Sequence, residues 1–438
     1  MPFAVRKSPR TKYTQQQLLV YPEKNQRMKS KVITALLLGL LAFATYSCMY
    51  AIRKPFAGFI YEETLWGWNI KSWMVIAQLL GYTLSKFFGI GWIGQLKHNN
   101  RRSQLILLLF SASIPLWVLP FSPINLWPIL MLANGFPLGI VWGIVFSYVE
   151  GRDLTEFIGA ILACTFVFSS GFVKYAALEL QNHFHMPAVN ATATLSAIAC
   201  ILAAIFSYFL DKTPAPTLDE ASRNAPRKEL NKLERKTFFG ENLQLLIPAI
   251  LIYAILTFLR DFRDNFTAEL LLESHNYSGK SIAQYETLIT LILLASIPFI
   301  SLIKNHLKAI QLTFITAAAG CILSLIAVYL YHNHALPGSY LLLISGLGLY
   351  AGYILINISI MNRIIGFRNI PGNCGFLMYS ADSTGYLSSI VVMSIALFQH
   401  KAAVQWFPIF EHLLTWGSVA VIVIALFPIR YCFLLTKK

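Results

Sequence analysis

The chain consists of long apolar segments separated by short polar ones. Windows of about 20 mainly apolar residues, which is the length of a helix that crosses a bilayer, recur along the whole sequence. They predict twelve transmembrane helices over residues 32–53, 72–96, 103–122, 125–149, 156–178, 190–210, 243–262, 281–303, 309–331, 338–362, 374–398 and 405–434. The pattern therefore indicates an all-α polytopic membrane protein.

The longest polar interruption divides the predicted helices six and six. It reads "DKTPAPTLDEASRNAPRKELNKLERKTFFGE" and contains three prolines. We expect two six-helix bundles joined by a cytosolic linker. The predicted segments are an N-terminal tail (1–31), the first bundle (32–210), the linker (211–242), the second bundle (243–434) and a short C-terminal tail (435–438).

Composition and charge agree with a membrane location. Charged residues make up 13% of the chain, against about 25% in soluble domains. Most of the 35 lysines and arginines lie in the tails, the linker and the loops on one side of an alternating topology. The positive-inside rule places that side in the cytosol, so the net charge of +15 reflects topology and not a nucleic-acid partner. The polar, basic N-terminus does not resemble a signal peptide, and a bacterial inner membrane fits the short loops.

The first helix of each predicted half carries the same pair of residues. Tyr46 precedes Arg53 by seven positions, and Tyr253 precedes Arg260 by seven. Seven residues are close to two helical turns, so both side chains of each pair lie on one helix face. If the halves are related by an axis along the membrane normal, the two arginines face each other across a central site.

Cations inside apolar spans are costly and mark functional sites. Lys86 follows Tyr82 by four residues, and Tyr50 lies one turn before Arg53. Two guanidinium forks and one ammonium suit a phosphate-type anion. The alternative interpretation is structural: Arg53 and Lys54 extend towards the interface, as Lys174 does, and Arg260 pairs with Asp264 four residues later.

Acidic residues within the spans are candidates for coupling to protons, because burial raises the pKa of a carboxyl group. Glu286 and Asp382 are the candidate coupling residues. Asp261 and Asp264 are expected to pair with Arg260 and Arg263. The span over 125–149 contains "NGFPLGIVWG", whose glycines predict close helix packing.

Three segments resemble the organophosphate:phosphate antiporters, a branch of the major facilitator superfamily. They are "YSCMYAIRKPF" from residue 46, "LLGYTLSKFFGIGWIGQLKHNNRR" from residue 79 and "YAILTFLRDF" from residue 253. The resemblance implies the major facilitator fold and a substrate phosphate held by Arg53 and Arg260, with Lys86 beside the same cavity. The sequence departs from the family at Phe168, where the family has a histidine.

The candidate substrate site therefore comprises Arg53, Lys86, Arg260, Tyr46, Tyr50, Tyr82 and Tyr253. We expect a monomeric exchanger of a phosphate ester for inorganic phosphate, with a small anion and the lipid bilayer as its partners. Two alternatives are a proton-coupled organic-anion symporter and a membrane sensor of phosphorylated ligands. Hydrolase, metalloprotease and kinase motifs are not found in the sequence, so we expect no enzyme activity, cofactor or metal. The cysteines form no C-x-x-C pair and are expected to be buried apolar residues.

Overall fold

The computed structural model describes residues 24–92, 100–152, 154–216, 220, 237, 239–296, 300, 303–368, 374–398 and 405–436. The first half contains α1 (Lys24–Arg53), η1 (Pro55–Gly58), β1 (Thr64–Leu65), β2 (Trp68–Asn69), α2 (Ile70–Trp92), α3 (Arg101–Val118), η4 (Leu119–Phe121), η5 (Ile124–Leu126), α4 (Trp127–Val149), α5 (Thr155–Ala163), α6 (Thr165–Phe184) and α7 (Ala188–Asp211). The second half contains α10 (Leu243–Asn265), α11 (Thr267–Glu273), α12 (Gly279–Ser296), α14 (His306–His332), α15 (Gly338–Leu355), the π-helical turn η6 (Ile356–Ile360), α16 (Met361–Arg368), α17 (Cys374–Phe398) and α18 (Trp406–Thr436).

The prediction of twelve helices in two bundles is confirmed. Nine helical stretches of the described chain are long and apolar enough to cross a membrane. The helices α2, α12 and α17 lie at the three remaining predicted positions. These three carry Lys86, Glu286 and Asp382, the charged residues that the sequence placed inside predicted spans. Much of the predicted linker lies outside the described residues, and α1 begins at Lys24, within the predicted N-terminal tail.

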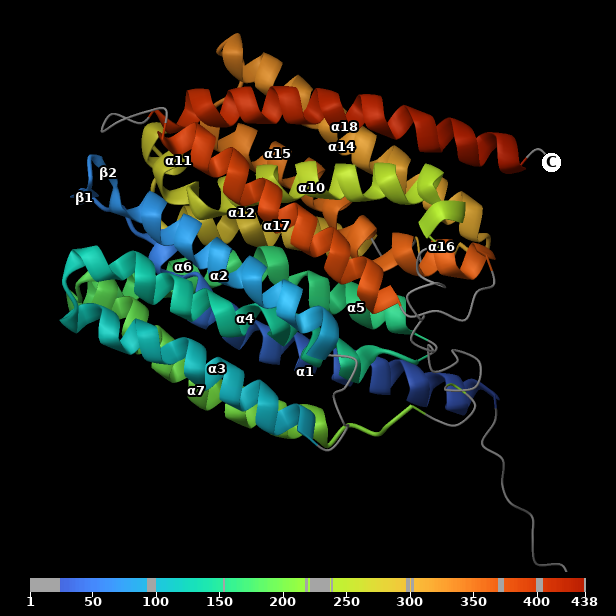
Figure 1. Ribbon diagram of the computed structural model, residues 1–438, viewed down its shortest axis with the longest axis horizontal. Coiled ribbons are helices and arrows are strands. Elements are labelled where there is room, and N and C mark those ends of the chain that lie inside the picture. Colours follow the sequence, from blue (N-terminus) through green and yellow to red (C-terminus); the bar gives the residue numbers. More distant parts are fainter. Residues whose placement is uncertain are drawn as a thin grey trace, which may run out of the picture.

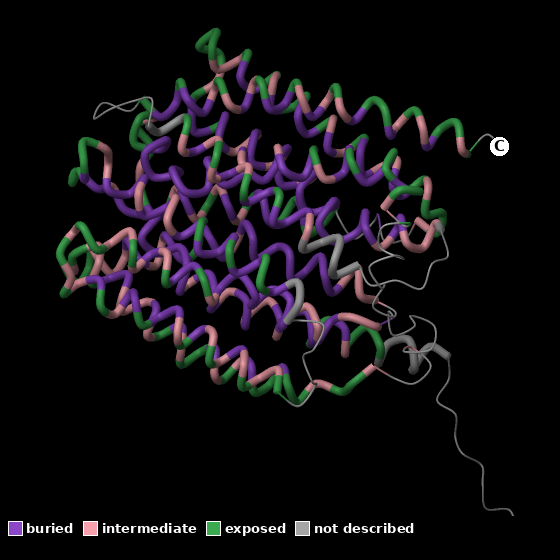
Figure 2. The backbone as a smooth tube through the Cα atoms, viewed as in Figure 1, coloured by how far each residue is buried: buried purple, intermediate pink, exposed green. Residues whose placement is uncertain are grey.

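The two halves lie side by side (Figure 1). In the first half α2 packs along α4, while α3 contacts α4 and α7; in the second half α14 packs against α15 and α18, and α10 against α17 and α18. The halves meet where α2 contacts α17 and where α6 contacts α12. Buried residues concentrate between the halves, and exposed residues line the outer helices (Figure 2).

The outer surface is apolar, as expected of a protein surrounded by lipid. Leu107, Ile201 and Leu426 are more than half exposed on α3, α7 and α18. Polar side chains such as Lys86 and Asp382 are buried instead. The sequence is therefore arranged with charge inside and apolar side chains outside, and the chain is a multi-pass membrane protein.

A short hairpin marks one end of the molecule, here called the hairpin end. The strands β1 and β2 pair antiparallel around Trp66 and Gly67, which both have positive φ values, 54° and 83°. Two-residue hairpin turns of this kind match the twist of the strands. The end of α1 and the helix α11 lie at the same end, whereas α16 and the last turns of α18 lie at the other, here called the tail end (Figure 1).

Candidate functional site

The three cations predicted to hold the substrate lie between the two halves. Arg53 is the last residue of α1, Lys86 lies on α2 and Arg260 lies on α10. Their relative exposures are 3%, 1% and 2%. Such burial of charge is expensive unless other groups compensate for it, so the partners of each cation decide what the site can bind.

Among the described residues, Arg53 has aromatic neighbours and no acidic partner. Its guanidinium carbon lies 4.1 Å from the ring centre of Tyr82 and 5.7 Å from that of Tyr386. Within the described part of the chain it forms no ion pair, and its buried Nε atom has no hydrogen-bond partner. A buried donor without an acceptor costs about 1–3 kcal/mol, and more when the group is charged. Arg53 is therefore suited to receive an anion.

Arg260 approaches the same point from the second half. Its guanidinium carbon lies 4.1 Å from the ring centre of Tyr353, and its Nη2 atom donates to the Tyr386 hydroxyl at 3.4 Å. One carboxylate partially compensates its charge, because Nη2 lies 3.0 Å from Asp261 Oδ1. Its Nε atom is buried without a partner, as in Arg53. The arginines of both halves thus converge on Tyr386.

Lys86 is paired across the halves. Its Nζ atom lies 2.7 Å from Asp382 Oδ2 on α17. Asp382 also accepts a hydrogen bond from the Tyr253 hydroxyl. That hydroxyl lies 3.0 Å from the Tyr353 hydroxyl and accepts a hydrogen bond from Asn357 Nδ2 at 2.8 Å. Asn357 lies in the π-helical turn η6, and such turns are frequent at functional sites. The carboxylate of Asp382 is therefore the partner of the Lys86 ammonium, which the sequence analysis had assigned to the substrate.

The predicted tyrosines are buried in the same region, where the Tyr82 ring contacts Arg53 and the Tyr253 hydroxyl contacts Asp382. Tyr46, Tyr50, Tyr82 and Tyr253 are at most 2% exposed. Aromatic contacts continue the wall, because the ring centre of Tyr46 lies 5.1 Å from that of Trp142. The site is therefore a group of buried cations with aromatic rings around them. Its role in binding remains a prediction.

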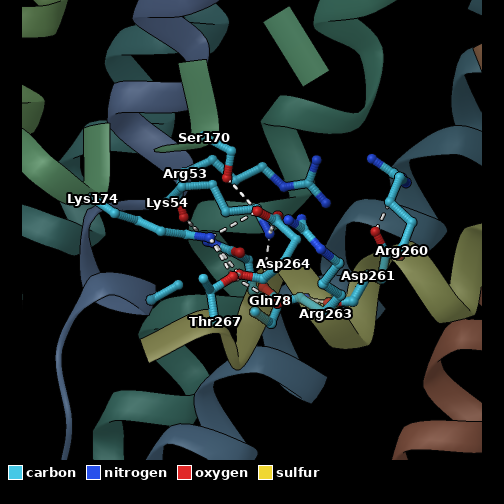
Figure 3. A network of polar contacts seen from close by, with 12 residues as sticks. Arg53, Lys54, Gln78, Ser170, Lys174, Arg260, Asp261, Arg263, Asp264 and Thr267 are labelled. Atoms are coloured by element: carbon cyan, nitrogen blue, oxygen red, sulfur yellow. Dashed lines mark hydrogen bonds and ion pairs between the residues drawn. The ribbon is translucent and has the colours of Figure 1, made fainter. Parts of the chain in front are cut away.

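A second polar cluster lies at the hairpin end and joins the halves through Asp264 (Figure 3). The carboxylate of Asp264 lies 2.6 Å from Lys54 Nζ and 2.8 Å from Lys174 Nζ. The expectation that Lys54 and Lys174 extend to the interface is wrong, since both are buried. The expected pair between Arg260 and Asp264 is also wrong; Arg260 pairs with Asp261 because the carboxylate of Asp264 points towards the first half.

The second candidate coupling residue, Glu286, belongs to a pair inside the second half. Its Oε1 atom lies 2.8 Å from Arg263 Nη1. Arg263 also donates to the Leu342 carbonyl oxygen at 2.9 Å. Because both partners move together with the second half, this pair can persist when the halves separate, unlike the pair of Lys86 and Asp382.

Tyr386 is a site residue that the sequence did not select, and the sequence ranked Tyr353 and Asn357 only among the weaker polar candidates. Tyr386 follows Asp382 by four residues, and Tyr353 precedes Asn357 by four. Each spacing places a tyrosine one helical turn from a polar residue. This is the same signal that identified Tyr82 before Lys86, so the pattern was present in the second half as well.

The fold is that of the major facilitator transporters. The xylose transporter XylE from E. coli, in a partially occluded inward-open conformation, matches with a TM-score of 0.56 and 13% identity, over 90% of this chain and 97% of that chain. The nucleoside transporter NupG matches with a TM-score of 0.58 and 17% identity, over 91% and 99%. A bacterial homologue of the human drug peptide transporters PepT1 and PepT2 matches with a TM-score of 0.57 and 15% identity, over 93% and 99%.

The sequence comparison gives a family but not an activity. The chain belongs to a family of unknown function, DUF5690, whose model matches residues 55–436. No curated protein sequence matches the chain. The substrate must therefore be argued from the site itself.

Proposed function

We propose that the protein is a secondary active transporter of a small organic anion, a phosphate ester exchanged for inorganic phosphate by alternating access. The observation that supports this most is Arg53, a buried guanidinium with no acidic partner in the described chain. Arg260 supplies a second fork from the other half. An oxyanion between them would give both unpartnered Nε atoms an acceptor and would join the two halves.

The charge of the buried core supports a dianion. Seven cations at the hairpin end and centre of the described chain face five carboxylates: Arg53, Lys54, Lys71, Lys86, Lys174, Arg260 and Arg263 against Asp261, Asp264, Glu269, Glu286 and Asp382. A phosphate monoester carries about two negative charges at neutral pH. Its entry would balance the excess of two positive charges.

The same charges explain how an empty site can close. A cavity of several uncompensated cations would resist closure without substrate. In the structure, however, Asp261 pairs with Arg260 and Asp382 pairs with Lys86. A substrate anion would replace these carboxylates at the cations. Exchange would then be favoured over empty return by Arg53, which is unpaired among the described residues, and not by all three cations.

The test is uptake of radiolabelled phosphate into proteoliposomes. We expect uptake into vesicles preloaded with phosphate and much slower uptake into empty ones, with phosphate esters competing. Uptake by the Arg53→Lys variant is measured in matched vesicles for comparison with the wild type. Equal uptake into loaded and empty vesicles would contradict obligatory exchange, and binding without any flux would indicate a sensor.

A proton-coupled symporter is the second candidate, and the pair of Lys86 and Asp382 supports it. A proton on Asp382 would weaken that pair and release the Lys86 ammonium to bind the substrate. The same vesicles test this alternative when they are empty and carry an imposed pH gradient. Accumulation that follows the gradient in the absence of internal phosphate would favour symport. We place both termini in the cytosol on the basis of the basic loops, and the protein in a bacterial inner membrane on the basis of its short loops.

A further inference from the structure

The cluster at Asp264 contains two ammonium groups that share one carboxylate. Lys54 and Lys174 belong to the first half, directly after α1 and on α6, whereas Asp264 belongs to α10 of the second half. The distances from the carboxylate to the two Nζ atoms are 2.6 and 2.8 Å, and the two lysines are 2% and 0% exposed. One of the two excess positive charges counted above for the buried cations and carboxylates therefore lies at this cluster.

The remaining contacts show how the first half holds an anion in this position. Ser170 donates its hydroxyl to Asp264 Oδ1 at 2.5 Å, and it lies on α6 one turn before Lys174. Lys54 also donates to Asn265 Oδ1 at 2.7 Å, and Lys174 to the Asp264 carbonyl oxygen and to Thr267 Oγ1 at 3.4 Å. Three donors of the first half thus surround one carboxylate supplied by the second.

A neighbouring ion pair between the halves is built differently. Lys71 of α2 pairs with Glu269 of α11, one ammonium with one carboxylate, at 2.7 Å. Lys71 also donates to the carbonyl oxygens of Ala57 and Phe59, both at 2.9 Å and both in its own half. Lys71 therefore keeps acceptors when the halves separate, whereas the acceptors of Lys54 and Lys174 within the described chain belong to the second half.

We propose that Lys54, Lys174 and Ser170 form a binding site for a phosphate-type oxyanion, and that the Asp264 carboxylate occupies this site while the hairpin end is closed. The inference rests on the proposed function, since alternating access is the motion that would withdraw Asp264. The first half would then retain two ammonium groups and a hydroxyl without a carboxylate. Lys54 directly follows Arg53, so an anion bound there would reach the central fork after a short displacement.

The first experiment asks whether an added anion can replace the Asp264 carboxylate. Asp264→Asn is made in the full-length chain with Arg53→Lys, so that binding at the central fork is impaired. Melting temperatures of the purified protein are compared in inorganic phosphate and in chloride at equal ionic strength. We expect the variant to melt several degrees higher in phosphate, because a ligand that binds the folded state stabilises it. The Arg53→Lys parent, whose Asp264 still fills the site, should show a much smaller difference.

Glu269→Gln in the same background is the matched control, because it also removes one buried carboxylate between the halves. It should lose stability without a specific gain from phosphate, since Lys71 retains its carbonyl acceptors. Adding Lys174→Gln to Asp264→Asn should abolish the phosphate effect. Equal melting of Asp264→Asn in phosphate and chloride, or a failure of phosphate to restore a poorly folded variant, would overturn the proposal.

Transport gives a separate test of the same site. Lys174→Gln in the otherwise unchanged chain should raise the KM for phosphate added at the hairpin end several-fold, with a smaller effect on the maximal exchange rate and on the KM from the tail end. Equal KM changes on both sides would contradict the assignment. If no variant and no wild-type preparation exchanges phosphate, the proposed function fails, but the melting experiment still decides whether the anion site exists.

Discussion

Arg53 is the residue on which the proposed chemistry most depends. Its guanidinium contacts the rings of Tyr82 and Tyr386 and has no carboxylate partner in the described chain. Contacts between a cation and aromatic rings contribute about 0.5–2 kcal/mol, which is less than the cost of burying an isolated charge. The site therefore keeps a cation whose compensation is expected from a ligand.

Arg53→Lys should reduce phosphate exchange about tenfold or more, equivalent to about 1.4 kcal/mol, because an ammonium cannot form the two parallel bonds of a guanidinium fork. Initial exchange rates in proteoliposomes with equal protein content measure the effect. Arg430→Lys, at an exposed position of α18, is the control and should exchange at the wild-type rate. Exchange by Arg53→Lys at the rate of this control would exclude the two-fork site.

At this scale the sequence located the charges but not their partners. Arg53, Lys86 and Arg260 stood out because charged residues are rare inside apolar spans. Their contacts join residues far apart in the chain; Lys86 and Asp382 are 296 positions apart. Spacing within one helix suggested that Arg260 pairs with Asp264, but the tertiary packing of the halves directs Asp264 to Lys54 and Lys174 instead.

At the scale of helices, α2 and α4 approach each other through glycine. A Cβ atom at Gly135 would lie 2.2 Å from the Gln78 carbonyl oxygen, and one at Gly81 would lie 2.2 Å from that of Leu132. The glycines of "NGFPLGIVWG" thus provide the close packing that the sequence predicted. This contact also holds Gln78, which donates to the Arg53 carbonyl oxygen at 2.9 Å, so the packing supports the end of α1.

Gly135→Ala should destabilise the protein by about 1–3 kcal/mol, the usual cost of overpacking, because α2 and α4 must move apart to admit the methyl group. Thermal melting in detergent measures the loss. Gly159→Ala on α5 is the matched control, since its Cβ would meet nothing closer than 3.7 Å. If the two variants melt at the same temperature, the contact between α2 and α4 is not as tight as described.

Helix positions were predictable because twenty-residue apolar windows have a clear length and composition. Local departures within these helices were not predictable. The fifth predicted span is divided at Cys164 into α5 and α6, and the tenth contains the π-helical turn η6. Both departures keep an apolar sequence, so their cause is the packing of neighbouring helices and not a change in residue type.

For the whole molecule, ion pairs between the halves are unevenly distributed. At the hairpin end Asp264 joins Lys54 and Lys174, and Glu269 joins Lys71. At the tail end of the described chain Glu156 of α5 lies 2.8 Å from Arg363 Nη2 of α16, and Glu156 is partly exposed. Arg363 also donates to the Ile303 carbonyl oxygen of its own half. Among the described residues, the tail end is therefore held by fewer and more solvated ion pairs than the hairpin end.

Glu156→Gln should open the tail end selectively, because it removes the carboxylate while the hairpin end keeps its pairs. Hydrogen exchange measured by mass spectrometry should become faster in α5 and α16 and remain unchanged around the junction of α10 and α11. Glu62→Gln, at an exposed loop position, should change neither region. Equal acceleration at both ends would indicate general loss of stability and not separation of the halves.

The polar linker and the equal number of spans were sufficient to predict two bundles, but not how they face each other. That arrangement depends on contacts such as those of α2 with α17 and α6 with α12, which no local pattern encodes. The repeated Tyr and Arg pair gave one correct indication, since both arginines lie in the interface between the halves.

The hairpin of β1 and β2 carries a tryptophan cluster at the hairpin end. Trp66 at its tip is 71% exposed and packs edge-on against Trp73, with ring centres 5.3 Å apart. Tryptophan rings prefer the level of the lipid headgroups, so we expect this cluster to hold the hairpin end at the membrane surface. When lipids with shorter acyl chains bring that surface closer to the midplane, the cluster must follow it or leave its preferred depth. The hydrophobic thickness of the bilayer would thereby affect the hairpin end, where Asp264 joins the two halves.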